Sequence, residues 1–248
     1  MAPWEILPDR SEIQVWFVEL VADATTIADC ASFLSADERE RASRFRFDHL
    51  KAAFTLSRGI LRVLLGRYLG VEPAAVRFAY GSRGKPRLVS PASSLEFNLA
   101  HSGRLAAYAF AVGCELGVDV EEVRSVPGQE RIVGRFFSPE ERAEWFGLDP
   151  SQRDEAFFRC WTGKEAYIKA VGGGLSMGLD AFRVSLRPEA PVPPDRTPGG
   201  LEAVGGWPLR SLKPAEGYAG ALVVSGPARS VHARPLLTAA SVLDLVKA

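Results

Sequence analysis

The sequence predicts an α+β protein whose strands pair mainly in antiparallel fashion. Its 248 residues are 47% hydrophobic and 24% charged, which is typical of a globular protein with one sizeable core or two smaller ones. Helix and strand patterns come in runs and do not alternate strictly, which favours α+β over a parallel βαβ sheet. Two helix starts of the same kind, far apart in the chain, indicate an internal duplication.

The strand predictions rest on short apolar or alternating runs. The first is residues 12–20, where Ile13, Val15 and Phe17 alternate with other side chains. The remaining predicted strands are 94–98, 105–112, 117–121, 182–186 and 218–225. Residues 188–208 are rich in Pro and Gly and are predicted to form an irregular loop.

Two capping boxes predict the duplicated helix starts. Ser35 precedes Glu38 by three positions, and Ser138 precedes Glu141 in the same way, so each serine and glutamate can cap one another's backbone N–H groups. The serines lie 103 positions apart, and longer helical patterns follow at 52–68 and 155–171. A boundary between two parts is expected near residues 113–117.

The formal net charge of zero hides a separation of charge. Residues 39–87 carry twelve Lys or Arg and three Asp or Glu, a net +9, so the remainder carries −9. A solvated helix face is one interpretation of this basic stretch. The clustering of its arginines makes phosphate binding the competing one.

The segment Gly117-Val118-Asp119-Val120-Glu121 carries two acids with strand spacing. Alternation sends Val118 and Val120 to one face and both carboxylates to the other, about 6 to 7 Å apart along the chain. A half-buried strand with a solvated acidic side explains the pattern, and so does a divalent-cation site, because Mg²⁺ takes one or two carboxylates plus waters and substrate phosphates.

A helical pattern at 157–169 places Glu165 and Lys169 four residues apart, on one face. Such a pair is commonly a surface ion pair worth a few tenths of a kcal/mol. Gly163 lies within this helix and costs about 1 kcal/mol there, which indicates a packing or access requirement nearby.

Two further segments are candidates for binding. His101 stands at a strand-to-turn junction, where a structural imidazole is the simpler explanation. The basic turn at 80–87 lacks the spacing of a phosphate-binding P-loop, but it can offer Lys85 as a point charge.

Cysteine content and hydropathy bear on location and partners. Three widely spaced cysteines, Cys30, Cys114 and Cys160, argue against a disulfide scaffold and suit a reducing compartment. We expect neither a secretory leader nor a membrane span, because the most apolar run, 105–114, is far shorter than the ~20 residues a span needs. The expected location is the cytoplasm, with neither nucleic acid nor membrane as a partner.

In combination and in this order, the segments resemble the Sfp-type 4′-phosphopantetheinyl transferases. The matching segments are 84–86 (Gly-Lys-Pro), 97–102 (Phe-Asn-Leu-Ala-His-Ser), 117–121 (Gly-Val-Asp-Val-Glu), 136–138 (Phe-Phe-Ser), 161–169 (Trp-Thr-Gly-Lys-Glu-Ala-Tyr-Ile-Lys) and 174–176 (Gly-Leu-Ser). They span most of the chain, and Trp161 and Ala166 resemble the subgroup of the family whose motif reads W-KEA. Ala100 departs from the serine of many relatives and removes a potential hydrogen bond to phosphate.

The resemblance implies a pseudo-dimer of two similar half-domains acting as a monomer, each half a small, mainly antiparallel sheet with packed helices. The division we expect is a basic N-terminal half-domain, residues 1–115, and a C-terminal half-domain, residues 116–248, with the metal and catalytic residues. The reaction implied is transfer of the phosphopantetheine arm of coenzyme A, the co-substrate, to a serine of an apo acyl or peptidyl carrier protein, with release of adenosine 3′,5′-bisphosphate. Mg²⁺ is the implied metal and Mn²⁺ the alternative.

Site residues carry over by position. Asp119, Glu121 and Glu165 are expected to bind the metal, with Glu165 also the general base. His101 and Lys85 are expected to contact the phosphates of coenzyme A, and Lys164 and the catalytic lysine, Lys169, to flank its pyrophosphate. Arg41, Arg44 and Arg58 are the expected cofactor-binding arginines of the first half.

Two points stay open on the sequence. Carriers of this family serve fatty-acid, polyketide or non-ribosomal peptide synthesis, and the sequence leaves all three open. The alternative function is a non-catalytic module that binds coenzyme A or a carrier protein; the retention of Asp119, Glu121, Glu165 and Lys169 speaks against it.

Overall fold

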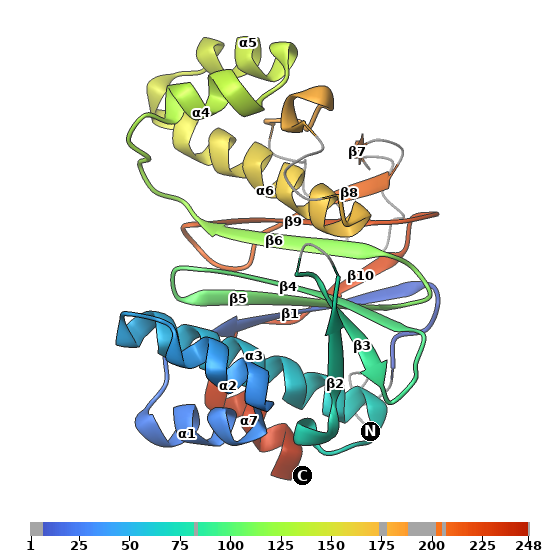
Figure 1. Ribbon diagram of the computed structural model, residues 1–248. Helices are drawn as coiled ribbons and strands as arrows, with labels where there is room; N and C mark the ends of the chain where they lie inside the picture. Colours follow the sequence, from blue (N-terminus) through green and yellow to red (C-terminus); the bar gives the residue numbers. More distant parts are fainter. Residues whose placement is uncertain (1–6, 82–83, 174–177, 188–201, 205–206, 248) are drawn as a thin grey trace.

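The chain folds into four layers in a computed structural model that describes residues 7–81, 84–173, 178–187, 202–204 and 207–247. Helices form the two outer layers and two sheets form the inner ones (Figure 1). The motif at 174–176 and most of the loop expected at 188–208 lie outside the described residues, although β7 and β8 begin within that loop. The predicted α+β class with mainly antiparallel pairing is confirmed.

The first sheet has the strand order β10-β1-β5-β4, and β11 also pairs with β1. Its strands are β1 (Glu12–Glu19), β4 (Leu95–Ser102), β5 (Leu105–Val112), β10 (Ser230–Ala233) and β11 (Leu237–Thr238). Pairing is antiparallel for β1 with β5 and for β4 with β5, whereas β10 and β11 run parallel to β1. A separate hairpin, β2 (Arg77–Tyr80) and β3 (Pro86–Ser90), stands beside this sheet.

The second sheet has the order β6-β9-β8-β7 and is antiparallel throughout. Its strands are β6 (Leu116–Glu122), β7 (Glu202–Val204), β8 (Trp207–Leu212) and β9 (Tyr218–Val224). The strand predicted at 182–186 is wrong, because this segment is irregular. Its backbone is bonded to helix side chains instead: the Val184 N–H donates to Glu141 Oε1 at 2.6 Å, and Arg159 donates to the carbonyl of Leu186.

Helices cover the outer face of each sheet. Against the first sheet lie α1 (Ala24–Phe33), α2 (Ala36–Ser43), α3 (Asp48–Leu69) and α7 (Ala239–Lys247), with a 3-10 turn at Pro73–Ala75. Against the second lies α6 (Arg153–Val171), with α4 (Gln129–Phe136) and α5 (Pro139–Gly147) beyond it on the side away from the sheet, and 3-10 turns at Pro150–Gln152 and Leu179–Ala181. The two long helices confirm the helical patterns predicted at 52–68 and 155–171, and Gly172 ends α6 in a left-handed conformation.

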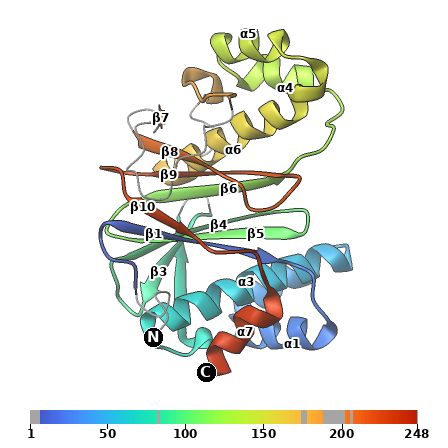
Figure 2. The same ribbon diagram turned by 180° about the vertical axis from the view of Figure 1, so that it is seen from behind.

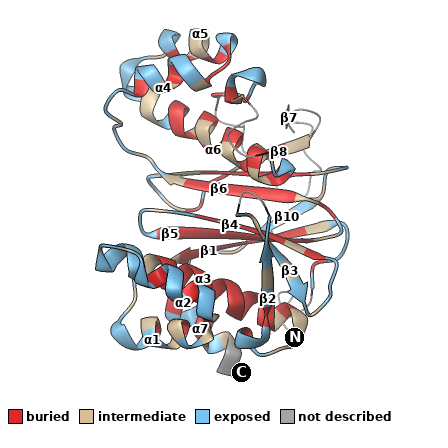
Figure 3. Ribbon diagram, in the orientation of Figure 1, coloured by how far each residue is buried: buried red, intermediate tan, exposed pale blue. Residues whose placement is uncertain are grey.

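Of the four apolar clusters among the described residues, three hold the layers together, and a small fourth one packs Leu34 and Ala42 against Phe54 of α3. One lies between the first sheet and its helices, and one between the second sheet and α6. The third lies between the two sheets, where β1 contributes Ile13, Val15 and Phe17. Strand β1 is therefore buried on both faces, as the red centre of Figure 3 shows. The halves pack sheet against sheet, so the strands at that contact fix how the halves sit together.

The last part of the chain returns to the first half. Strands β10 and β11 extend the first sheet beside β1, and Arg67 of α3 donates to the backbone carbonyl of Leu245 in α7. Figure 2 shows this return from behind. The expected second half-domain, 116–248, thus needs a correction: residues 230–247 belong structurally with the first half.

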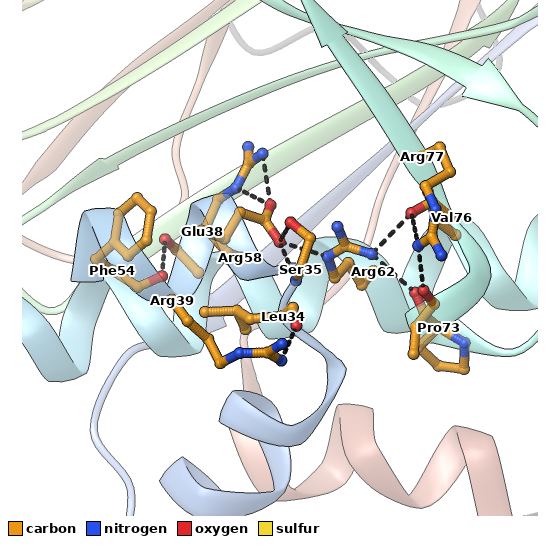
Figure 4. A network of polar contacts seen from close by, with 12 residues as sticks. Leu34, Ser35, Glu38, Arg39, Phe54, Arg58, Arg62, Pro73, Val76 and Arg77 are labelled. Atoms are coloured by element: carbon orange, nitrogen blue, oxygen red, sulfur yellow. Dashed lines mark hydrogen bonds and ion pairs between the residues drawn. The ribbon is translucent and has the colours of Figure 1, made fainter. Parts of the chain in front are cut away.

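The duplication extends to buried side chains. Each capping-box serine donates its backbone N–H to the glutamate three residues on, at 3.1 Å for Ser35 and 2.6 Å for Ser138. Each glutamate also pairs with a buried cation of the following long helix. Glu38 pairs with Arg58 and Arg62 of α3, at 2.7 and 2.6 Å, as Figure 4 shows. Glu141 pairs with a lysine of α6 at 2.8 Å.

Candidate functional site

Strand β6 carries its acids on the face predicted from alternation. Val118 and Val120 pack into the core between the sheets. Asp119 faces the other way, where its Oδ1 accepts a hydrogen bond from the ammonium of Lys169 in α6 at 2.6 Å. The alternation predicted for Val118, Asp119 and Val120 is thereby confirmed, and the face that carries Asp119 is the one that meets α6.

Gly117 explains why α6 lies so close to β6. A Cβ atom at this position would lie 2.1 Å from the carbonyl oxygen of Ala166 and 2.4 Å from the backbone nitrogen of Ala170. Only a residue without a side chain permits this contact between strand and helix backbones. The turn of α6 that touches Gly117 is the one that carries Glu165 and Lys169.

Asp119 is the most deeply buried acid of this region, with 5% of its surface exposed. Burial raises its pKa to about 7, Lys169 acts in the opposite direction, and the charges of Glu121 and Glu165 raise the pKa further. The second carboxylate oxygen, Oδ2, is buried and has no hydrogen-bond partner among the described residues. A buried oxygen of this kind is available to a ligand.

The same electrostatic coupling includes Glu165 and His101. Burial raises the pKa of Glu165, Lys169 lowers it, and Glu121 raises it. His101 keeps part of its surface exposed, yet the protein atoms around its ring lower its pKa, and the charge of Lys169 lowers it further. We call the group of Asp119, Glu121, Glu165, Lys169 and His101 the β6–α6 site.

A divalent cation fits this site through the free oxygen of Asp119. Hard cations bind carboxylate oxygens, and Mg²⁺ commonly takes only one or two of them together with waters and substrate phosphates. Across the described part of the chain, no three His, Cys, Asp or Glu side chains gather closely enough to hold a metal ion by themselves. The shell of three carboxylates therefore remains a prediction.

Lys85 lies at the contact of the two halves. Its ammonium donates to Glu115 Oε2 and to the Leu116 carbonyl, both at 3.2 Å, and to the Ala170 carbonyl at 3.5 Å. The β2–β3 hairpin of the first half thus reaches the end of α6, one residue beyond Lys169. Its expected contact with phosphate stays a prediction.

Lys164 and Arg58 were both expected to bind coenzyme A, and neither belongs to the β6–α6 site. Lys164 is fully buried, pairs with Glu141, and donates to the carbonyls of Leu179 and Phe182 at 2.6 and 2.8 Å. Successive helix residues point about 100° apart, so Lys164 cannot share the face of Glu165 and Lys169. The expectation that it flanks a pyrophosphate is corrected to a structural role.

Arg58 also has a structural role, because its side chain is buried among polar partners of the first half. Its guanidinium pairs with Glu38 and donates to the hydroxyl of Tyr80 at 2.7 Å, which ties α3 to the β2–β3 hairpin. Its side chain is 8% exposed. The expectation that it binds coenzyme A is corrected in the same way. Arg41 and Arg44 are exposed at the end of α2, the first beside the ring of Phe54 and the second paired with Glu40, and their expected role stays a prediction.

Sequence reasoning assigned no structural role to two polar residues of β4. Asn98 is buried and accepts the Val118 N–H at 2.9 Å, while the hydroxyl of Ser102 donates to Glu121 and accepts the Glu122 N–H at 3.2 Å. Both lie on the face of β4 turned toward the second sheet, as does Ala100, which is buried between the sheets. Strand alternation at 98, 100 and 102 was the available signal.

Fold and site together define a single-chain protein of two related α+β halves with its coupled ionisable residues where α6 crosses β6. Comparison with known protein families narrows this class to one family. The family described as the 4′-phosphopantetheinyl transferase superfamily matches residues 115–222. The family described as the N-terminal part of 4′-phosphopantetheinyl transferase matches residues 22–112.

Individual relatives of the chain carry the same family name. The 4′-phosphopantetheinyl transferase HetI of Nostoc sp. is 39% identical over 217 residues, which cover 87% of this chain and 88% of the relative. A putative 4′-phosphopantetheinyl transferase of Synechocystis sp. is 35% identical over 67% of this chain and 68% of its own length. The 4′-phosphopantetheinyl transferase Sfp of Bacillus subtilis is 31% identical over 65% of this chain and 70% of its own length.

The chain belongs to the Sfp-type 4′-phosphopantetheinyl transferases. The resemblance found in its motifs and the enzyme class expected from them are thereby confirmed. No helix among the described residues is long and apolar enough to cross a membrane.

Proposed function

We propose that the chain transfers the 4′-phosphopantetheine group of coenzyme A to a serine hydroxyl of an apo acyl or peptidyl carrier protein, with Mg²⁺ as the metal. In this reaction the serine oxygen bonds to the phosphorus that carries pantetheine. The bond from that phosphorus to the bridging pyrophosphate oxygen breaks, and adenosine 3′,5′-bisphosphate leaves. The observation that carries the proposal is the buried Asp119 carboxylate, bonded to Lys169 through one oxygen and free at the other.

Lys169 and Glu165 have complementary tasks in this proposal. Charge develops on the pyrophosphate oxygens during transfer, and a lysine ammonium stabilises it. Glu165 accepts the serine proton, directly or through a water. The burial that raises its pKa makes it a stronger base than an exposed glutamate.

Asp119, Glu121 and Glu165 would hold the metal, which when bound supplies positive charge that clamps the diphosphate and stabilises the leaving phosphate. Lys85 and His101 would contact the phosphates of coenzyme A. The place of Lys85 beside the end of α6 supports this assignment, because its ammonium reaches the residue after Lys169. Arg41 and Arg44 would bind the 3′-phosphate.

We also propose that the enzyme is a monomer, that it acts in the cytoplasm and that its basic surface docks the carrier. Both halves come from one chain, which supports a monomeric enzyme. Three buried free cysteines suit the reducing cytoplasm. Arg58 and Arg62 of the basic stretch at 39–87 are buried against Glu38, but its exposed cations offer charge for docking an acidic carrier as well as for binding coenzyme A.

Loading of purified apo carriers tests the proposal. The protein is incubated with coenzyme A, Mg²⁺ and a panel of carriers from fatty-acid, polyketide and peptide synthesis, and mass spectrometry detects the added phosphopantetheine. We expect Glu165→Gln and Asp119→Ala to abolish loading. Glu155→Gln, which changes an exposed acid in the first turn of the same helix, should leave it intact. Near-normal loading by either site variant would overturn the assignment of its role, and a wild-type protein that binds coenzyme A without loading any carrier would favour a binding module.

A further inference from the structure

The turn between β4 and β5 is bonded to the second half. The hydroxyl of Ser102 donates to Glu121 Oε2 and accepts the N–H of Glu122 at 3.2 Å. Two residues later, the Arg104 N–H donates to the hydroxyl of Tyr218 in β9 at 3.1 Å. The approach is close, because a Cβ atom on Gly103 would lie 2.4 Å from Glu122 Oε2. This turn of the first half is therefore clamped onto the strand that carries the site acids.

Ser102 is the member of this clamp that touches a site residue. A serine hydroxyl has one proton to donate. Since its oxygen already accepts the Glu122 N–H, the proton is directed to the carboxylate of Glu121, and a hydrogen bond to an ionised acceptor is stronger than a neutral one. The N–H that anchors the hydroxyl belongs to the backbone of β6 itself, so the orientation is set by the strand.

Glu121 needs such a support. It lies near the end of β6, its side chain is 25% exposed, and it forms an ion pair with Arg124 at 3.9 Å. The Arg124 side chain is 56% exposed, and an ion pair so open to solvent holds a carboxylate weakly. The bond to Ser102 and the contact with Arg124 both fall on Oε2, which leaves the lone pairs of Oε1 for a ligand.

We propose that Ser102 is a positioning residue of the transfer reaction, which orients Glu121 for the divalent cation and thereby links the packing of the two halves to metal affinity. This inference rests on the proposed function, since it assigns Glu121 to the metal. Residues that hydrogen-bond a metal-ligating carboxylate typically change metal affinity by about 10- to 100-fold when they are removed.

The test measures metal binding directly. Mn²⁺ is titrated into the protein in the presence of coenzyme A, and free Mn²⁺ is followed by electron paramagnetic resonance. We expect Ser102→Ala to weaken Mn²⁺ binding by about tenfold or more and to raise the Mg²⁺ concentration needed for half-maximal transfer, with the KM for carrier unchanged. Ser102→Thr keeps a hydroxyl and should restore both quantities.

Ser225 provides the matched control. Its hydroxyl also accepts a backbone N–H at the start of β6, that of Glu115 at 2.9 Å, away from the site acids. Ser225→Ala should leave Mn²⁺ binding at the wild-type value. Should Ser102→Ala fail to fold, Ser102→Cys, which keeps the shape with a weak donor, replaces it in the same comparison.

Wild-type Mn²⁺ affinity in a folded Ser102→Ala or Ser102→Cys protein overturns the inference, and so does an equal loss in Ser225→Ala. A wild-type protein whose Mn²⁺ affinity falls on Ser102→Ala substitution, but which loads no carrier, would refute the proposed function and leave the positioning role standing. The metal titration and the loading assay thus report on the two proposals separately.

Discussion

The ammonium of Lys164 and the carboxylate of Glu141 form an ion pair at 2.8 Å in which both side chains are fully buried. This pair joins α6 to the capping box that begins α5. The equivalent pairing in the first half, between Glu38 and Arg62, is also buried, so the duplicated halves share a polar link between the short capped helix and the long one. Lys164 is therefore separate in purpose from Lys169, although both lie on α6.

Lys164→Ala should destabilise the protein strongly, because it leaves the carboxylate of Glu141 buried without a countercharge. Breaking a buried pair in this way costs about 3–5 kcal/mol. Unfolding in urea, followed by circular dichroism, measures the change. Lys169→Ala is the contrasting variant: Asp119 can take up a proton when its partner is lost, since its pKa is already about 7. That variant should stay folded and lose transfer activity. Equal stability losses in the two variants would contradict the distinction.

Gly117→Ala should push α6 away from β6. The added methyl group would meet helix backbone, which cannot move aside as a flexible side chain can. We expect a loss of about 1–3 kcal/mol in the free energy of unfolding and a clear drop in transfer rate, because Lys169 moves with the helix. Gly134→Ala on α4 is the control. Nothing lies within 4 Å of its added Cβ atom, and alanine favours the helix. A Gly117→Ala protein with wild-type rate would show that the contact does not position the site.

Stability of the metal-free protein should fall as the pH rises from about 4 to about 7. The folded-state pKa of Asp119 is raised to about 7, chiefly by burial, so the folded protein binds this proton more tightly than the unfolded chain, whose aspartate titrates near pH 3.9. The stabilising contribution is complete below the unfolded pKa and is lost as the pH passes the folded one. Asp119→Asn should flatten this dependence in urea titrations with EDTA, whereas Glu130→Gln, an exposed change on α4, should not. Parallel curves for wild type and Asp119→Asn would refute the assignment.

Arg41 and Arg44 should matter only when coenzyme A carries its 3′-phosphate. The double variant Arg41→Gln/Arg44→Gln is expected to raise the KM for coenzyme A about tenfold, since a hydrogen bond to a charged group contributes about 1.5–3 kcal/mol. The KM for 3′-dephospho-coenzyme A should stay unchanged. Arg131→Gln, on the exposed surface of α4, is the control for general loss of positive charge. Equal effects on both coenzymes would place the 3′-phosphate elsewhere.

Local signals predicted much of this structure. The capping boxes at Ser35 and Ser138 form as expected, because their bonds involve residues three apart. Strand alternation assigned Asp119 and Glu121 to one face of β6, and helical spacing brought Glu165 and Lys169 together. These patterns depend on neighbours in sequence, and a single sequence displays them fully.

Other features depend on distant partners. Arg58 looked like a phosphate ligand because sequence does not show that Glu38 and Tyr80 surround it. The separation of Lys164 from Glu165 follows from helix geometry alone, since adjacent helix residues face different directions. Residues 182–186 show the alternation of a strand, yet their backbone bonds to Glu141 and Arg159 instead of a neighbouring strand.

The return of residues 230–247 to the first sheet has a consequence for synthesis of the protein. Strand β1 has β5 on one side, whereas its other side awaits β10 and β11, which leave the ribosome only after all strands of the second sheet. The first sheet begins before the second and is completed after it, so that a nascent chain must keep one edge of β1 unpaired while the second half is made. Loss of the C-terminal segment would expose a strand edge, which is a template for aggregation, in the half that contains none of the site acids.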